Sequence, residues 1–174
     1  MKKTNSFILA VLAITIAFTA CTESTTTESA AGSDSAASTM VSTTDANQDK
    51  LEANKKLAAD FAQALLGDKD STSIDKYVAD DIKQHNPLLQ DGKEWLKNAL
   101  RPFLANPNIE KTKINIEMMS AEGDMVWLLI KDVAPNGKVF ARVSILRIEN
   151  GKVAEAWKVS EAVPSKSVNE NSMF

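Results

Sequence analysis

The sequence contains very few of the residues that build metal sites and nucleophile sites. Its 174 residues include one cysteine and one histidine. A single cysteine cannot form a disulfide within the chain, and thiolate zinc sites or Cys/His nucleophile pairs need more such side chains. An all-oxygen metal site remains open, but no spacing motif supports one. We therefore expect no metal and no other cofactor.

Basic runs are also missing. The net charge is −3, and losing Lys2 and Lys3 with the N-terminal segment described below makes the chain more acidic. Proteins that bind nucleic acid carry basic surfaces, because they neutralise phosphates. The charge therefore argues against a nucleic-acid partner. The remaining composition, 44% hydrophobic and 25% charged, is typical of a soluble globular domain.

The N-terminus has the features of a bacterial secretion signal. Lys2 and Lys3 precede an apolar run from Phe7 to Phe18. A basic start, a short apolar core and a small residue before the cleavage point are the order of a signal peptide. The alternative, an uncleaved membrane anchor, is disfavoured because a spanning helix needs about 20 apolar residues. We predict a signal peptide over residues 1–20.

The only cysteine directly follows this segment. Phe18-Thr19-Ala20-Cys21 resembles the lipobox of bacterial lipoproteins. The resemblance implies cleavage before Cys21, lipidation of its thiol and attachment to a membrane of the cell envelope by the lipid. Thr22 rather than Asp follows the cysteine, which by resemblance to enterobacterial sorting favours the outer membrane. Whether the protein faces the periplasm or the cell surface stays open.

The segment after Cys21 predicts a flexible tether. Residues 22–47 are rich in Ser, Thr and Ala, with no aromatic residue and no Lys or Arg. Such a segment buries too little apolar surface to offset the entropy lost on ordering. We assign residues 21–48 to the lipidated cysteine and a disordered Ser/Thr tether, and residues 49–174 to one domain.

Hydrophobic periodicity predicts three helices in the first half of this domain. In the first helix, Leu57, Phe61 and Leu65 recur at intervals of four residues, which places them on one face. Asp91-Gly92-Lys93-Glu94 has the form of a capping box and predicts the start of the third. The expected helices cover residues 49–67, 71–78 and 91–105, with a short strand or loop at 80–86.

The second half predicts strands. The run from Met125 to Ile130 is continuously apolar, which is typical of a central strand buried on both faces. Pro135-Asn136-Gly137 and Asn150-Gly151 are strong hairpin signals. Three helices followed by an antiparallel meander give an α+β fold. Helices on one face of a curved sheet commonly leave a ligand cavity.

Seven short segments in the domain form a recognisable series. They are Gln84-His85-Asn86-Pro87, Asp91-Gly92-Lys93-Glu94, Ala121-Glu122-Gly123-Asp124, residues 147–153, Glu155-Ala156-Trp157, Val163-Pro164 and residues 171–174. In their order and spacing they resemble the SnoaL-like proteins, which belong to the nuclear transport factor 2-like superfamily and include polyketide cyclases. The resemblance covers about residues 53–174. It implies a cone-shaped, curved antiparallel sheet packed by three N-terminal helices, a pocket inside the cone, and dimers formed through the sheet.

The resemblance also implies proton-transfer chemistry whose main residues this chain lacks. SnoaL-like cyclases use an Asp on the long strand before the Arg of the final hairpin, together with a strand histidine. The corresponding position holds Ser144, and the strand histidine is absent because His85 is the only histidine. A hydroxyl without a neighbouring base is a poor proton acceptor. No catalytic residue is assigned, and His85 is the one candidate.

His85 and Asn86 remain as candidate ligand-binding residues. His85 either faces the pocket mouth, where it binds a ligand or relays a proton, or holds a turn by hydrogen bonding to the backbone. Both interpretations stay open.

Arg142, Ser144 and Lys158 are the other candidates for ligand binding. Arg142 and Ser144 share a strand face because side chains alternate along a strand. If their face and that of Lys158 line the cone, either cation could hold an anionic ligand. The alternative, which exposure statistics favour, is that both are solvated or paired with Glu155 and Glu161.

Three functions are compatible with the sequence. The leading hypothesis is a membrane-anchored domain that binds an unknown small molecule in its cone without cyclase activity. The second is a SnoaL-like enzyme of the aldol, cyclase or isomerase type, using His85 with Asp80 or Asp81 beside a deep cavity. The third is an interaction module, in which the cone is filled and an exposed apolar sheet face binds a partner protein. A homodimer is a possible partner state.

Overall fold

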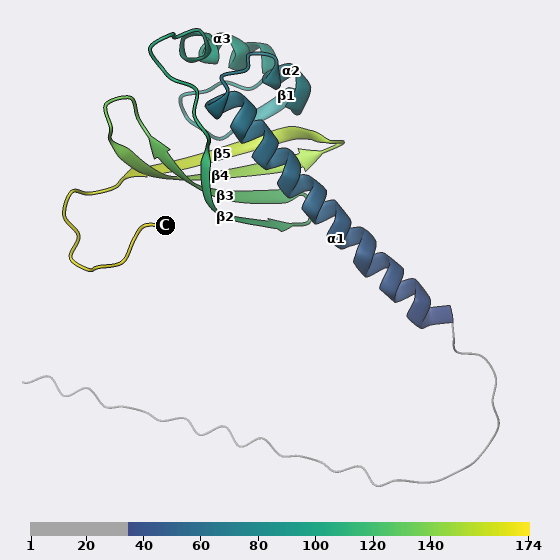
Figure 1. The fold of residues 1–174 in the computed structure, drawn as a ribbon. Helices are drawn as coiled ribbons and strands as arrows, with labels where there is room; N and C mark the ends of the chain where they lie inside the picture. The colour runs from purple at the N-terminus through teal and green to yellow at the C-terminus, as the bar shows by residue number, and fades with distance from the viewer. Residues whose placement is uncertain (1–34) are drawn as a thin grey trace, which may run out of the picture. The chain divides into compact units, whose positions relative to one another are not determined.

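The structure, a computed structural model, describes residues 35–174 of the chain, and their side chains from residue 45 onward. The predicted signal peptide and the lipidation site at Cys21 lie outside the described residues. None of the described helices is both long and apolar enough to cross a membrane. The elements in chain order are α1 (Ser35–Ala62), the π-helix η1 (Gln63–Gly67), α2 (Ser73–Tyr77), β1 (Val78–Gln84), α3 (Lys93–Leu104), β2 (Asn115–Glu122), β3 (Met125–Val133), β4 (Val139–Glu149) and β5 (Lys152–Ala162) (Figure 1).

The fold is α+β, as expected, and its five strands form one open sheet with the order β1-β5-β4-β3-β2. β2 to β5 make the predicted antiparallel meander. β1 pairs parallel to β5, so the expectation of a wholly antiparallel sheet was wrong and the sheet is mixed. A parallel pair needs a long crossover, and here α3 and three strands separate its two members in sequence.

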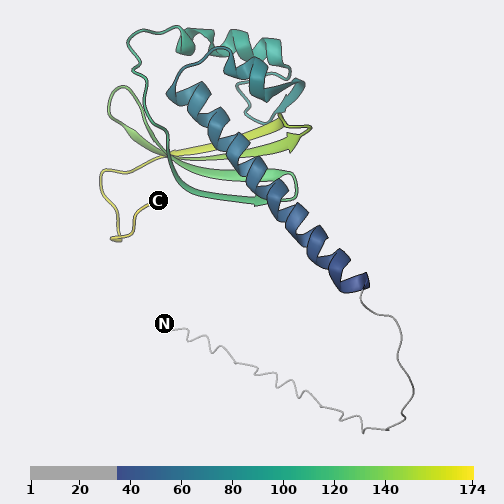
Figure 2. The same ribbon diagram turned by 45° about the vertical axis from the view of Figure 1, so that its right-hand side comes forward.

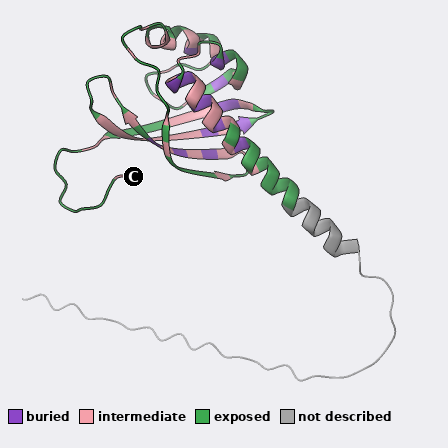
Figure 3. Ribbon diagram, viewed as in Figure 1, coloured by how far each residue is buried: buried purple, intermediate pink, exposed green. Residues whose placement is uncertain are grey.

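α1 lies across one face of the sheet in both ribbon views (Figures 1 and 2). Positions 54, 58, 61 and 62 of α1 and position 65 of η1 are buried, a spacing that marks one helical face. The apolar residues among them join buried residues of α2, α3 and the strands in a single core. Figure 3 colours the buried stretches of α1 and of the strands purple. The core comprises Ala58, Phe61, Ala62, Leu65, Ile74, Val78, Ile82, Leu96, Val126, Leu128, Ile130, Leu146, Ile148 and Val153.

α1 begins at Ser35, so part of the segment predicted as a disordered tether is helical. Residues 45–50 are all exposed, and tertiary packing therefore does not hold this part of the helix. Adding turns to an existing helix is far easier than nucleating one. The packed half of α1 supplies that nucleus, which explains how a polar, Ala-containing segment continues the helix.

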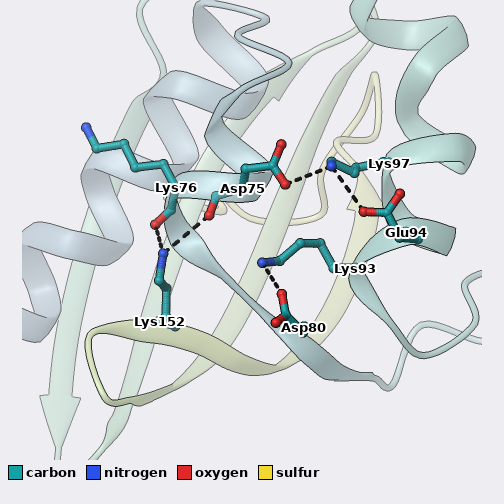
Figure 4. A network of polar contacts seen from close by, with 7 residues as sticks. All are labelled: Asp75, Lys76, Asp80, Lys93, Glu94, Lys97 and Lys152. Atoms are coloured by element: carbon teal, nitrogen blue, oxygen red, sulfur yellow. Dashed lines mark hydrogen bonds and ion pairs between the residues drawn. The ribbon is translucent and has the colours of Figure 1, made fainter.

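A network of lysines joins the small helices to the sheet (Figure 4). Lys93 of α3 pairs with Asp80 of β1, and Lys97 Nζ lies 2.7 Å from Asp75 Oδ1 of α2. Lys152, at the start of β5, donates to the backbone carbonyl of Lys76. These contacts connect α2, α3, β1 and the β4–β5 hairpin to one another. They lie at the end of the sheet away from the cavity described below.

Candidate functional site

The sheet has two chemically different faces. The helix-side face carries the buried core, including Leu128. Because Leu128 pairs with Ser144 and Ser144 with Lys158, these three side chains lie in one row on that face. Arg142 pairs with the buried Ile130 and belongs to the next row of the same face. The structure therefore places three of the five predicted ligand-binding residues on the side of the sheet that the helices cover.

A cavity of about 890 Å³ opens beside this row. Its walls are Leu66 of η1, Phe103 of α3, the ends of β3 and β4, and the segment 105–114, which we call the loop wall. Apolar atoms make up most of the exposed surface of the lining, which is usual for small-molecule sites of this size, although about half of its residues are polar. The lining residues are Leu66, Phe103, Asn108, Ile109, Glu110, Thr112, Lys113, Ile114, Asn115, Lys131, Asp132, Val133, Ala134, Pro135 and Arg142.

The loop wall is fixed by polar contacts from the end of the first helical segment. The Gln63 amide donates to Thr112 O at 3.0 Å and accepts from Ile114 N–H at 2.9 Å. Lys69 Nζ donates to Ile109 O at 2.9 Å. Thr112 N–H also donates to Gly67 O at 3.0 Å. A loop without secondary structure is held in this way against η1, and the cavity has a defined second wall.

Gly67 allows the close approach of that wall. A Cβ atom at this position would lie 2.5 Å from Thr112 O and 2.3 Å from Gln63 Nε2. The sequence predicted Gly67 as a helix-ending residue, and it is the last residue of η1. The more important property here is its missing side chain.

Arg142 is the main polar group of the cavity. Its guanidinium pairs with the Asp132 carboxylate across β3 and β4, and its side chain is only 16% exposed. Its Nε atom is buried and has no hydrogen-bond partner among the described residues. Glu155 and Glu161, the predicted partners in the solvated alternative, do not pair with it. The guanidinium is thus largely desolvated and short of acceptors.

Lys158 is the second cation on this face, and it is an exposed residue beside the cavity and not part of its lining. Partial desolvation lowers the pKa of its ammonium group, and the nearby charge of Arg142 lowers it further, while Asp132 acts in the opposite direction. Two cations therefore share one nearby carboxylate. Ser144 lies beside Lys158 in the paired register and offers a hydroxyl, not a base.

His85 lies on the opposite face of the sheet, which we call the outer face. Its Nε2 is 2.7 Å from Glu155 Oε1, and its ring stacks on Trp157 with centroids 4.3 Å apart. Glu155 also accepts from Arg147 Nε at 2.8 Å. Hydrogen bonds from His85 and then Arg147 lower the pKa of Glu155. The five predicted ligand-binding residues therefore do not form one site.

The predicted carboxylate partners of His85 were wrong. Asp80 pairs with Lys93, and Asp81 is exposed without an ion pair to any described residue. The partner is Glu155, seventy positions away in sequence. Asn86 accepts from Leu88 N–H at 3.1 Å through its side chain and caps the turn that follows His85. Its contacts are those of a turn residue.

Apolar side chains cover much of the outer face. Trp127, Ile145 and Trp157 pair in one row, and Leu129, Val143 and Val159 pair in the next. Val159 is 67% exposed and Met118, on β2, is 59% exposed. An apolar depression of about 460 Å³ lies over β2, β3 and Val143. Trp127 and Trp157 are thus surface-facing residues of the sheet and not members of the core.

Sequence reasoning missed Asp132, Glu155 and Gln63. Asp132 follows a buried strand, and period-2 alternation from Leu128 would have placed it on the helix-side face. Glu155 was considered only as a partner of cations on the other face. Gln63 gave no signal, because its contacts reach a loop some fifty positions away.

Comparison with known proteins agrees with this architecture. A family model described as a SnoaL-like domain matches residues 58–156, more than half of the chain. No curated protein matches. A nuclear transport factor 2-like protein of unknown function from Burkholderia xenovorans LB400 has a TM-score of 0.53 at 20% identity, over 67% of this chain and 89% of that one.

Two further solved structures share the fold. An LEH-like epoxide hydrolase of M. tuberculosis has a TM-score of 0.54 at 15% identity, over 64% of this chain and 85% of that one. A nuclear transport factor 2-like protein of unknown function from Mesorhizobium loti has a TM-score of 0.54 at 14% identity, over 64% of this chain and 93% of that one. At these identities the likeness shows the fold alone.

Proposed function

Because this chain belongs to the SnoaL-like family, we propose that it binds a small molecule in the cavity between the loop wall and the helix-side face, without cyclase activity. The observation that carries the proposal is the cavity of about 890 Å³, with Leu66 and Phe103 on its apolar wall and Arg142 at its polar end. An apolar pocket with a few polar groups is the usual form of a small-molecule site.

The absence of cyclase activity follows from what the cavity lacks. The lining contains no histidine, and the helix-side position where the resemblance implies a catalytic Asp holds Ser144. A lost general base typically costs about 10²- to 10⁴-fold in rate. Asp132 cannot readily replace it, because its carboxylate is paired with Arg142.

Binding can be tested by ligand-induced stabilisation of the full chain. A compound at 100 times its Kd raises the free energy of unfolding by about 2.7 kcal/mol. We expect a screen of small amphiphilic compounds to give such shifts, and Phe103→Ala to weaken them. Leu88→Ala is the control, because Leu88 is 82% exposed and lies outside the cavity lining. Equal shifts in the two variants would place binding elsewhere.

An enzyme that uses His85 is the second candidate, favoured by the 2.7 Å contact between His85 and Glu155. This pair is on the outer face, and His85 is 43% exposed. A proton-transfer site there would need another molecule to exclude water. The full chain should be assayed on simple aldol and retro-aldol substrates beside His85→Ala. Turnover above background that vanishes in His85→Ala would favour the enzyme over our proposal.

We also propose that the protein is anchored to the cell envelope through lipidated Cys21 and that two copies pair through the outer face. The apolar rows of β3, β4 and β5 support the second part, since contiguous exposed apolar surface commonly marks an interface. Analytical ultracentrifugation of the full chain beside Val159→Glu tests it. A monomer in both would contradict the pairing.

A further inference from the structure

The charges at the cavity point to the class of ligand. Arg142 and Lys158 lie on adjacent rows of the helix-side face, and Asp132 is the one carboxylate paired with them among the described residues. On the loop wall, Glu110 and Lys113 have opposite charges. Lys131 and Arg142 are the other cations of the lining and Asp132 is its other carboxylate, so the lining has one more positive than negative charge, although the chain as a whole is acidic. Lys158 lies beside Arg142 but outside this lining.

The hydrogen bonds of Arg142 show that neighbouring side chains do not neutralise the excess positive charge at the cavity. A guanidinium has five N–H donors, and among the described residues only Asp132 accepts from it through a side chain. Its buried Nε lacks an acceptor. Burying a charged donor without an acceptor is costly. The pKa of Lys158, an exposed residue, is lowered by partial desolvation and by the charge of Arg142, which shows that the two cations lie close together.

The other walls of the cavity favour a ligand with a large apolar part. Leu66, Phe103 and Ile109 line it together with Ile114, Val133 and Pro135. A ligand that fills the space must therefore carry its charge at one end and present carbon to the remaining walls. A planar carboxylate suits a guanidinium, because the two groups can make parallel hydrogen bonds.

We propose that the ligand is an amphiphilic carboxylate whose acid group lies between Arg142 and Lys158 and whose apolar body contacts Leu66 and Phe103. This inference rests on the proposed binding function and names its ligand class. The carboxylate neutralises the second cation, which Asp132 alone leaves unpaired. The apolar body replaces water against the side chains of η1 and α3.

Three soluble probes with the same phenylbutyl body test the charge: 4-phenylbutyrate, 4-phenylbutanol and 4-phenylbutylamine. Titration calorimetry of the full chain should show the carboxylate binding about tenfold more tightly than the alcohol, the size expected of a charge-assisted hydrogen bond. The amine should bind most weakly. Arg142→Gln and Lys158→Gln should each remove most of the preference for carboxylate over alcohol. Lys50→Gln, at an exposed position of α1, should leave it unchanged.

Asp132→Asn tests the same charge with Arg142 left in place, which matters if Arg142→Gln fails to fold. It removes the competing carboxylate, so the affinity for 4-phenylbutyrate should rise while that for the alcohol stays the same. If 4-phenylbutanol binds as tightly as 4-phenylbutyrate and Lys158→Gln has no effect, the proposed ligand class is wrong. Binding in the cavity would still stand. Failure of all three probes to bind, while other amphiphilic compounds stabilise the chain and Phe103→Ala weakens that effect, would overturn this inference and leave the proposed function in place.

Discussion

Glu155 Oε1 accepts a hydrogen bond from His85 Nε2 at 2.7 Å, which joins the turn after β1 to β5 on the outer face. Glu155 Oε2 accepts from Arg147 Nε on β4 at 2.8 Å. One carboxylate thus connects three segments of the chain, and its side chain is only 17% exposed. Glu149 is a second carboxylate on Arg147, at 2.9 Å.

This connection predicts a specific loss of stability in acid. Because the pKa of Glu155 is lowered in the folded state, its contribution is fully present above the unfolded pKa, near 4.5, and is lost as the pH falls through the folded pKa. Glu155→Gln should therefore lower the melting temperature at pH 7, and the gap to the unmodified chain should close below about pH 4.5. Thermal melts from pH 7 to pH 3 measure this. Glu161→Gln, at an exposed position, serves as the control.

Gly67→Ala tests how tightly the loop wall is packed. Alanine favours a helix over glycine by about 1 kcal/mol. The added Cβ would, however, lie 2.5 Å from a backbone oxygen that cannot move without shifting the wall. Overpacking costs about 1–3 kcal/mol, so we expect a net destabilisation of about 1–2 kcal/mol in urea unfolding. Ala53→Ser, at an exposed site on α1, adds one heavy atom without that clash. A stabilised Gly67→Ala variant would show that helix propensity dominates.

The order of the helices and strands could be predicted from the sequence, because turn residues and apolar runs mark most of them locally. The turn at Asn150-Gly151 was predicted from residue types, and both residues have the positive φ values that favour glycine and asparagine. The central strand was also predicted correctly, since Val126, Leu128 and Ile130 are buried. The capping box at Asp91 was wrong, because Asp91 accepts from Gln84 N–H at 2.8 Å and α3 has no side-chain cap.

The site was less predictable because its parts meet through long-range pairing. Alternation on β4 correctly put Arg142 and Ser144 on one face, but could not show which face the helices cover. His85 follows β1, and its position on the outer face depends on the parallel pairing of Gln84 with Ala156. No local pattern specifies that register, so the sequence grouped His85 with residues on the other face.

The Cys21 prediction concerns residues outside the described part of the chain and depends on the lipobox resemblance alone. Cys21→Ser should release the protein from the membrane fraction or leave its signal uncleaved, because no thiol remains to lipidate. Fractionation of cells followed by mass measurement of the N-terminus tests both. Normal cleavage with unchanged membrane association would contradict a lipid anchor at this cysteine.

A final prediction concerns where the folded domain begins. The first half of α1 precedes Asp49, yet the side chains of residues 45–50 are exposed and Asn54 is the first buried residue of the helix. A chain shortened to begin at Asp49 should therefore melt within a few degrees of one that begins at Thr22, since a loss of about 1 kcal/mol already shifts the midpoint by several degrees in a domain of this size. Far-ultraviolet circular dichroism should meanwhile lose signal from the missing turns. A much lower midpoint would mean that the segment before Asp49 packs on the domain. An unchanged helical signal would mean that this segment is not helical in solution, as the composition of residues 22–47 predicts.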